Sequence, residues 1–400
     1  MTTQEVDPTA KATGPVLSED QLLRFGERAS VYDRENRFFA EDFEELREAG
    51  YLRMPIPESF GGLGMTLAQV CQEQRRLAYH APATALATNM HLYWMGVAAT
   101  LHDMGDPSCD WMLEDGARGE VFAAGHSESG NDLPVLYSTA QAERVDGGYR
   151  FTGHKNFGSL TPVWTRLGLH AQDNSDPANP KVVHAFMPRE TAGYTIKETW
   201  DTLGMRATAS QDTLLDSAFV PDAYIGRVVP PDFAGADLFV LAIFVWAEPT
   251  FGNIYLGIAQ RAFDLALQSA GTKTSIALGG KAMTTNPMVQ YTVAEMALEL
   301  DGITAHLDRV AVDWSGGVDH GGLWPAKLVS VKYHAVEGAR RVVKLALDVV
   351  GGGAIFKGQE LERLLRDVQL GPVHPANSLL VHEIVGKTHL GLLGQLPRWS

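Results

Sequence analysis

The sequence predicts an α+β protein of three units in the order helical, β, helical. The chain has 400 residues, which is enough for two or three packed units of roughly 100–200 residues each. Apolar residues recur at helical spacing up to about residue 120 and again from about residue 232. Between these stretches, turns divide the chain into short segments rich in β-forming residues.

The first unit is expected to be a helical domain over residues 19–120, preceded by a flexible tail over residues 1–18. Ser18, followed by Glu19 and Asp20, has the features of a helix N-cap with an acidic first turn. Residues 51–64 contain two prolines and three glycines and predict a loop. Residues 66–113 are helical in pattern and so apolar that one helix is expected to be buried on most faces.

The second unit is expected to be a β domain over residues 121–231, because its short segments alternate in polarity between turns. A C-terminal helical-bundle domain is expected over residues 232–400. The periodic segments predict helices over Phe251–Ala270, Pro287–Trp314, Trp324–Val350, Gln359–Leu370 and Ser378–Leu396.

Charge and composition exclude several classes of protein. The formal net charge of -15 disfavours nucleic acid and anionic membrane surfaces as partners. Two cysteines outside any CxxC motif, Cys71 and Cys109, argue against a disulfide framework or a thiolate zinc site, and we expect both to be buried apolar thiols. The N-terminus has no apolar signal region, and the longest apolar run, residues 238–247, is half the ~20 residues that span a membrane. We therefore expect a cytoplasmic protein.

Common catalytic motifs are absent from the sequence. No GxGxxG follows a strand, and no GxxxxGK[ST] or GxSxG occurs. His382-Glu383 with His389 is not an HExxH motif, so no metal site is expected.

An ordered set of other motifs runs along the chain from about Ser18 to Leu393. The set consists of PESFGGLG at 57–64, FAAGHSESGND at 122–132, GHKNFGS at 153–159, LGMRATAS at 203–210, LGIAQ at 256–260 and VGGGA at 350–354. It resembles the acyl-CoA dehydrogenase superfamily of flavoproteins, including its flavin-dependent monooxygenases. The resemblance implies an N-terminal helical domain, a middle β-barrel or sandwich domain and a C-terminal four-helix bundle.

The resemblance also implies where a flavin binds. Ser127 falls where the family binds the flavin pyrimidine, Phe157 where an aromatic ring packs on the isoalloxazine, and Ser159 where a hydroxyl group bonds near N5. Alternate residues of a strand face the same way, which suits Phe157 and Ser159. Taken alone, Phe157 is equally well a core aromatic. The motif at 203–210 resembles a family marker whose role is largely structural.

The resemblance implies that a second set of residues contacts the pyrophosphate and ADP end of FAD. Lys273 falls near the arginine that contacts the pyrophosphate, and Gln290 falls where relatives touch the cofactor of a neighbouring subunit. Gly351, Gly352 and Gly353 resemble the turn that approaches the neighbour's ADP, and glycine allows such close approach. A plain helix–helix turn is the alternative. The resemblance therefore implies FAD and a homo-oligomer, a dimer or a tetramer.

The catalytic carboxylate of a dehydrogenase is missing from its usual place. Counting from Arg366-Asp367-Val368, the position of the family's glutamate falls on Pro375, which cannot take a proton. Glu248 lies within one residue of the place where some relatives carry the glutamate, and its apolar surroundings favour a neutral carboxyl group. The alternative is a helix cap with Pro249 at the first helical position.

Three histidines support a chemistry other than that of a dehydrogenase. His374 and His382 resemble the pair in the C-terminal region of the monooxygenases, and His91 fits a buried active-site histidine in the same relatives. The alternative for each is a core or surface histidine. Those enzymes take reduced flavin from a partner reductase. In this interpretation the flavin would be FMN or FAD.

Three functions therefore stay open. The leading expectation is an FAD-dependent oxidation of an acyl-CoA, with Glu248 as base and an electron-transfer protein as partner. The alternative is a monooxygenase that uses reduced flavin on a small organic substrate, with His91, His374 and His382 near the flavin and a flavin reductase as partner. The third is a catalytically silent ligand-binding or assembly subunit.

Overall fold

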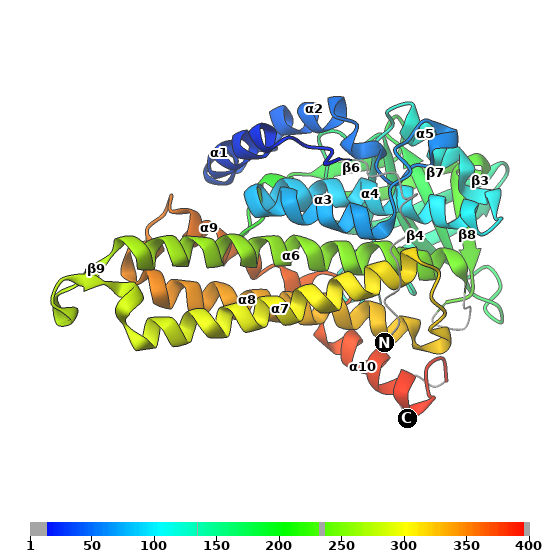
Figure 1. Cartoon of the computed structure of the whole chain (residues 1–400). Helices are drawn as coiled ribbons and strands as arrows, with labels where there is room; N and C mark the ends of the chain where they lie inside the picture. Colours follow the sequence, from blue (N-terminus) through cyan, green and yellow to red (C-terminus); the bar gives the residue numbers. More distant parts are fainter. Residues whose placement is uncertain (1–13, 134, 232–236, 396–400) are drawn as a thin grey trace.

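The computed structural model describes residues 14–133, 135–231 and 237–395. Helices form both ends of the described chain and strands lie between them, which confirms the predicted fold class (Figure 1). Of the predicted tail, residues 1–13 lie outside the described residues, as does the predicted junction near residue 232.

The N-terminal helices agree with the predicted pattern. They are α1 (Glu19–Glu35), α2 (Ala40–Glu48), α3 (Leu67–His80), α4 (Pro82–Asp103) and α5 (Asp110–Ala117). Ser18 caps α1 as predicted, because its side chain accepts a hydrogen bond from the Gln21 N–H. Residues 51–64 form the predicted loop between α2 and α3, and α4 is buried along most of its length. Cys71 and Cys109 are free and buried, as predicted.

The strands form one mixed sheet of eight strands. They are β1 (Phe122–Gly125), β2 (Gln141–Val145), β3 (Gly148–Gly158), β4 (Arg166–Asp173), β5 (Lys181–Pro188), β6 (Tyr194–Lys197), β7 (Gln211–Pro221) and β8 (Ile225–Val229). The order in the sheet is β6-β7-β3-β2-β4-β5-β8, and β1 pairs with β4 in parallel. This arrangement places the end of β3 beside the start of β7, where two of the sequence motifs meet.

The C-terminal part consists of three long helices and two shorter ones. They are α6 (Leu238–Thr272), α7 (Pro287–Ser315), α8 (Trp324–Val350), α9 (Glu360–Val368) and α10 (Ser378–Leu390), with a small hairpin of β9 (Thr274–Ser275) and β10 (Lys281–Ala282) after α6. Figure 1 shows the long helices side by side, with α3 and α4 above α6 and the sheet at one end. The bounds of α8 are those predicted. The prediction for α6 is wrong at its start, because the helix continues through Pro249.

Helix α6 is the buried centre of the molecule. It packs against α3, α4, α7 and α8. By length and composition it is the one helix in the described residues that could cross a membrane, but 83% of its most apolar window is buried inside the fold. That burial is what a core helix of a folded domain shows.

Gly257 allows α6 to pass close to α3. A Cβ atom at this position would lie 2.6 Å from the Arg75 carbonyl oxygen and 2.9 Å from the Tyr79 nitrogen. Both atoms belong to the backbone of α3, so neither can swing away. The glycine of the LGIAQ motif is therefore required for helix packing.

Replacing Gly257 by alanine should destabilise the protein by about 1–3 kcal/mol, because the new methyl group overpacks a helix–helix contact. Gly271 is the matched control on the same helix, since a Cβ there meets no atom within 4 Å. Gly271→Ala should be neutral or stabilising by up to about 1 kcal/mol. Urea unfolding followed by circular dichroism measures both changes, and equal effects of the two substitutions would contradict this packing argument.

Candidate functional site

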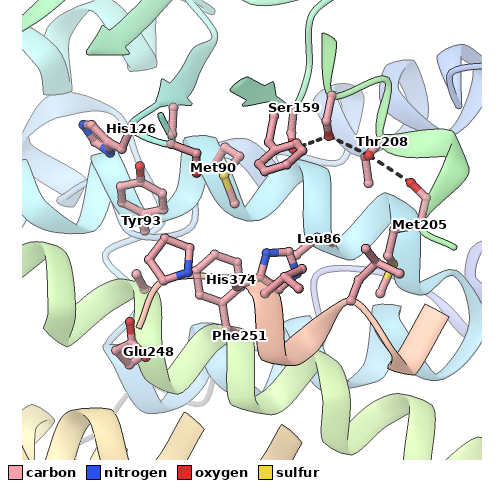
Figure 2. A pocket seen from close by; sticks show the side chains of 18 of the residues that line it. Leu86, Met90, Tyr93, His126, Ser159, Met205, Thr208, Glu248, Phe251 and His374 are labelled. Atoms are coloured by element: carbon pink, nitrogen blue, oxygen red, sulfur yellow. Dashed lines mark hydrogen bonds between the residues drawn. The ribbon is translucent and has the colours of Figure 1, made fainter. Parts of the chain in front are cut away.

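A cavity of about 350 Å³ lies where α4, α6, the end of β3 and the segment after α9 meet (Figure 2). Helix α4 contributes Leu86, Met90 and Tyr93, which share one helix face because they are four and three residues apart. Phe251 extends the apolar wall from α6. An enclosed, mainly apolar wall with a few polar groups is typical of a site for a small organic ligand or cofactor.

The three residues predicted to face the flavin all line this cavity: Ser127, Phe157 and Ser159. Phe157 is 53% exposed, so it is not a core aromatic, and its ring lies edge-on to Trp200. The sequence analysis explained the common orientation of Phe157 and Ser159 by alternation along a strand, and this explanation is wrong. Phe157 has a φ of 61° and β3 ends at Gly158, so a turn rather than the strand pleat brings Ser159 to the cavity.

Ser159 is the first group of a chain of hydroxyls. Its Oγ lies 2.7 Å from Ser210 Oγ, which lies 2.7 Å from Thr208 Oγ1. The Thr208 hydroxyl donates to the Met205 carbonyl oxygen at 2.9 Å. Dashed lines in Figure 2 follow this chain. The motif at residues 203–210 therefore contributes polar groups to the cavity wall, whereas the sequence analysis expected a largely structural role. The hydroxyl residues at alternate positions, Thr208 and Ser210, were the signal that could have indicated this role.

A buried ion pair supports the β side of the cavity. The Lys155 ammonium donates to the Glu128 carboxylate and, at 2.5 Å, to the His170 carbonyl oxygen. Glu128 also accepts hydrogen bonds from Ser138 Oγ at 2.6 Å and from the Thr139 N–H at 2.7 Å. Burial raises the pKa of Glu128, but Lys155 and these hydrogen bonds outweigh it, so the pKa is lowered and the carboxylate stays charged. The pair fixes the loop that begins beside Ser127.

His126 is a cavity residue that the sequence analysis missed. It is 7% exposed, and its Nε2 has no hydrogen-bond partner among the described residues. The ring packs edge-on against Trp94 and His170. Burial holds its pKa well below the usual value, so the ring is neutral. Its place directly before Ser127 in the second motif was the signal that could have identified it.

Glu248 lies on the cavity wall, in the middle of α6. The helix-cap alternative is therefore wrong, since α6 begins at Leu238. Its Oε1 accepts a hydrogen bond from the Ala376 N–H at 3.2 Å, whereas Oε2 has no partner in the described residues. Burial raises the pKa of Glu248 to about 8, against the opposing effects of the Lys332 ammonium and the Ala376 N–H.

His374 faces the same cavity from the segment after α9 (Figure 2). Its Nε2 lies 2.8 Å from the Tyr255 hydroxyl, and its ring stacks on Phe251 with centroids 5.2 Å apart. Burial lowers the pKa of His374 to about 3, assisted by the charge of Lys332, so the imidazole is neutral. Pro375, next in the chain, lines the same wall; that it stands at the position of the family's glutamate stays a prediction.

The other two predicted histidines do not reach the cavity. His91 is fully buried, and its ring nitrogens contact the Leu52 carbonyl oxygen and the Phe122 N–H, each at 3.0 Å. It therefore joins three backbone segments and has no nitrogen left for a ligand. His382 is exposed on α10 and contacts the Ser378 carbonyl oxygen. Both predictions are wrong. His91 lies on another face of α4 than the cavity residues Leu86, Met90 and Tyr93, and His382 lies on the solvent face of α10.

The residues predicted to hold the far end of FAD lie together at the opposite end of the helical bundle, near β9 (Figure 1). Lys273 donates to the Val350 carbonyl oxygen, directly before the turn at Gly351, Gly352 and Gly353. Gln290 donates to the Thr284 carbonyl oxygen at 2.9 Å. Gly351 has a φ of 75°, and a Cβ on any of the three glycines would meet no atom within 4 Å. Their contact with a neighbour's cofactor stays a prediction.

The residues present at the cavity fit a flavin. Aromatic and aliphatic side chains form the flat walls that a ring system requires, and the hydroxyl of Ser159 stands among them. His126 Nε2 and Glu248 Oε2 are buried polar atoms without a partner in the part of the chain that the structure describes. A bound molecule with polar edges would satisfy such atoms, whose burial otherwise costs free energy.

Two family descriptions match the chain. "Acyl-CoA dehydrogenase, N-terminal domain" matches residues 24–108, and "Acyl-CoA dehydrogenase, C-terminal domain" matches residues 250–378. The second match includes Glu248's neighbours on α6 and the segment that carries His374.

Relatives of three kinds resemble the chain over most of its length. L-evernosamine nitrososynthase of a Micromonospora species is 30% identical over 88% of this chain and 83% of its own. The putative acyl-CoA dehydrogenase YdbM of Bacillus subtilis is 27% identical over 91% and 93%, and dibenzothiophene monooxygenase of Rhodococcus qingshengii is 27% identical over 98% and 94%.

A solved structure confirms the fold over most of the chain. The nitrososynthase of Micromonospora carbonacea superposes with a TM-score of 0.80 and 26% identity, over 93% of this chain and 95% of that one. The relatives are flavin enzymes rather than silent subunits. The chain therefore belongs to the acyl-CoA dehydrogenase superfamily and is a flavin-dependent oxidoreductase.

Proposed function

We propose that the protein is a monooxygenase that uses reduced flavin, supplied by a separate reductase, to oxygenate a small, mainly apolar organic substrate. One observation carries this proposal: His374 and Pro375 form the cavity wall after α9, so this wall presents no carboxylate at the position that the resemblance assigns to a dehydrogenase's glutamate. The carboxylate that does line the cavity, Glu248, is held by the Ala376 N–H.

His374 is placed to relay a proton, because a neutral imidazole carries a proton on one ring nitrogen and a lone pair on the other. Its Nε2 contacts Tyr255, whose hydroxyl keeps its proton because burial raises its pKa. Stacking on Phe251 fixes the orientation of the ring. When bound, a reduced flavin supplies the two electrons that split dioxygen, with one oxygen atom going to the substrate and the other to water. A neutral imidazole at the cavity wall suits the proton transfers that such a reaction requires.

The apolar cavity walls support the choice of substrate class. Leu86, Met90 and Phe251 offer apolar contact to a bound molecule. Dibenzothiophene monooxygenase is a relative of this chain, and a structurally similar protein has been solved with FMN and indole. These two aromatic compounds are therefore suitable probes.

A second candidate is the oxidation of an acyl thioester, because Glu248 is a buried carboxyl group on the cavity wall. Its free Oε2 and raised pKa are properties of a base that removes a proton from carbon. Lys332 argues against a free base. This buried ammonium donates to the carbonyl oxygens of His374 at 2.9 Å and Ala376 at 2.8 Å and balances the charge of Glu248. We therefore assign Glu248 to the support of the segment that carries His374.

Isotope labelling separates the two candidates. Protein loaded with reduced FMN and mixed with ¹⁸O₂ and indole or dibenzothiophene should give a product that carries one ¹⁸O atom, detected by mass spectrometry. Protein loaded with oxidised flavin and mixed without oxygen with short, branched and aromatic acyl-CoAs should keep its flavin absorption. Loss of the absorption with any thioester would contradict the monooxygenase.

The dependence on pH tests Glu248 directly. As a base with a pKa of about 8 it acts only when deprotonated, so flavin reduction by a thioester would rise about tenfold per pH unit below pH 8 and level off above it. The proposal expects no thioester-driven reduction from about pH 6 to about pH 9. A rising limb that disappears in Glu248→Gln would establish the dehydrogenase instead.

Replacing His374 and Glu248, one at a time, by glutamine tests their separate roles. His374→Gln should lower the yield of oxygenated product per dioxygen consumed by at least ~100-fold, since it removes the group that moves the proton. Glu248→Gln keeps an acceptor for the Ala376 N–H and should change that yield less than about threefold. Hydrogen peroxide and product are measured together, and the reverse order of the two effects would contradict the assignment.

A further inference from the structure

The direction of every hydrogen bond in the hydroxyl chain follows from its last member. The Met205 carbonyl oxygen can only accept, so the single hydroxyl proton of Thr208 points to it. Thr208 must then accept from Ser210, whose only hydroxyl proton is used in that bond. Ser210 in turn accepts from Ser159. The Ser159 proton is therefore directed away from the cavity.

Ser159 consequently offers the cavity lone pairs and no proton. It has no other side-chain partner in the described part of the chain. All three hydroxyl residues are more than nine-tenths buried, so water has little access to reverse the chain. The Met205 carbonyl oxygen also accepts from the Thr208 N–H at 3.1 Å, so reversal costs the free energy of the Thr208 hydroxyl bond alone.

The two redox states of a flavin differ at N5, the atom that the resemblance places near the Ser159 hydroxyl. Oxidised flavin has a lone pair at N5, whereas reduced flavin has an N–H there. A lone pair facing the Ser159 oxygen is repelled, while an N–H donates to it. We propose that the chain Ser159–Ser210–Thr208 makes the cavity select reduced flavin over oxidised flavin. This inference rests on the proposed function and deepens it, because a monooxygenase must capture reduced flavin from its reductase.

Anaerobic titration of the full-length protein with oxidised and with reduced FMN, followed by flavin absorbance and fluorescence, gives the ratio of the two dissociation constants. The wild-type protein should bind reduced FMN more tightly. Thr208→Val removes the acceptor of the Ser210 proton, so Ser210 can donate to Ser159 and the Ser159 proton can turn to the cavity. The preference should fall at least tenfold, which lowers the midpoint potential of bound FMN by about 30 mV.

Further variants make this result specific to the direction of the chain. Ser210→Ala also releases the Ser159 proton and should reduce the preference in the same way. Thr208→Ser keeps the hydroxyl and should keep the wild-type ratio. Thr161→Val is the matched control, because the Thr161 hydroxyl is buried nearby but donates to the Gly158 carbonyl oxygen outside the chain. It should leave the ratio unchanged.

Three results would overturn the inference: a wild-type preference for oxidised FMN, a ratio unchanged in both Thr208→Val and Ser210→Ala, or an equal loss in Thr161→Val. The proposed function fails differently, through flavin reduction by a thioester. That result would leave the measured preference and its loss in the variants intact, so the two failures are distinguishable.

Discussion

The burial of α6 is the constraint on which the rest of the structure depends. This helix packs against helices of both the N-terminal and C-terminal parts, so its two ends and its faces determine where the other elements can lie. Gly257 sets its distance from α3, and the face with Glu248 and Phe251 forms one wall of the cavity. The site is thus a consequence of how the core helix meets the sheet.

Charges inside this core are balanced where they support the cavity. Glu128 and Lys155 hold the loop beside Ser127, and Lys332 holds the carbonyl oxygens on either side of Pro375. Removing one partner of a buried charge pair is costly, so the Glu128–Lys155 pair ties the wall to the core. The charged groups thus position the cavity wall, whereas the neutral groups His374 and Ser159 face the cavity.

The sequence predicted the fold better than the site. Long periodic helices such as α8 were predicted at their observed bounds, whereas the start of α6 was not, because proline normally marks a helix start and here lies inside the helix. Motif resemblance placed Ser127, Phe157, Ser159 and His374 at one cavity. It could not show that His91 points into the core, that His126 lines the cavity, or that a hydroxyl chain joins Ser159 to Thr208. Those facts depend on helix rotation and on hydrogen bonds between distant segments.

The central claim is that a flavin binds in the cavity between α4 and α6 with its reactive edge toward the hydroxyl chain. A crystal structure of the protein grown with FMN under reducing conditions tests it most directly. The account predicts that flavin N5 lies within hydrogen-bond distance of Ser159 Oγ, with His374 on the same cavity wall as the substrate space. A flavin bound elsewhere, or with its N5 edge turned away from Ser159, would contradict it.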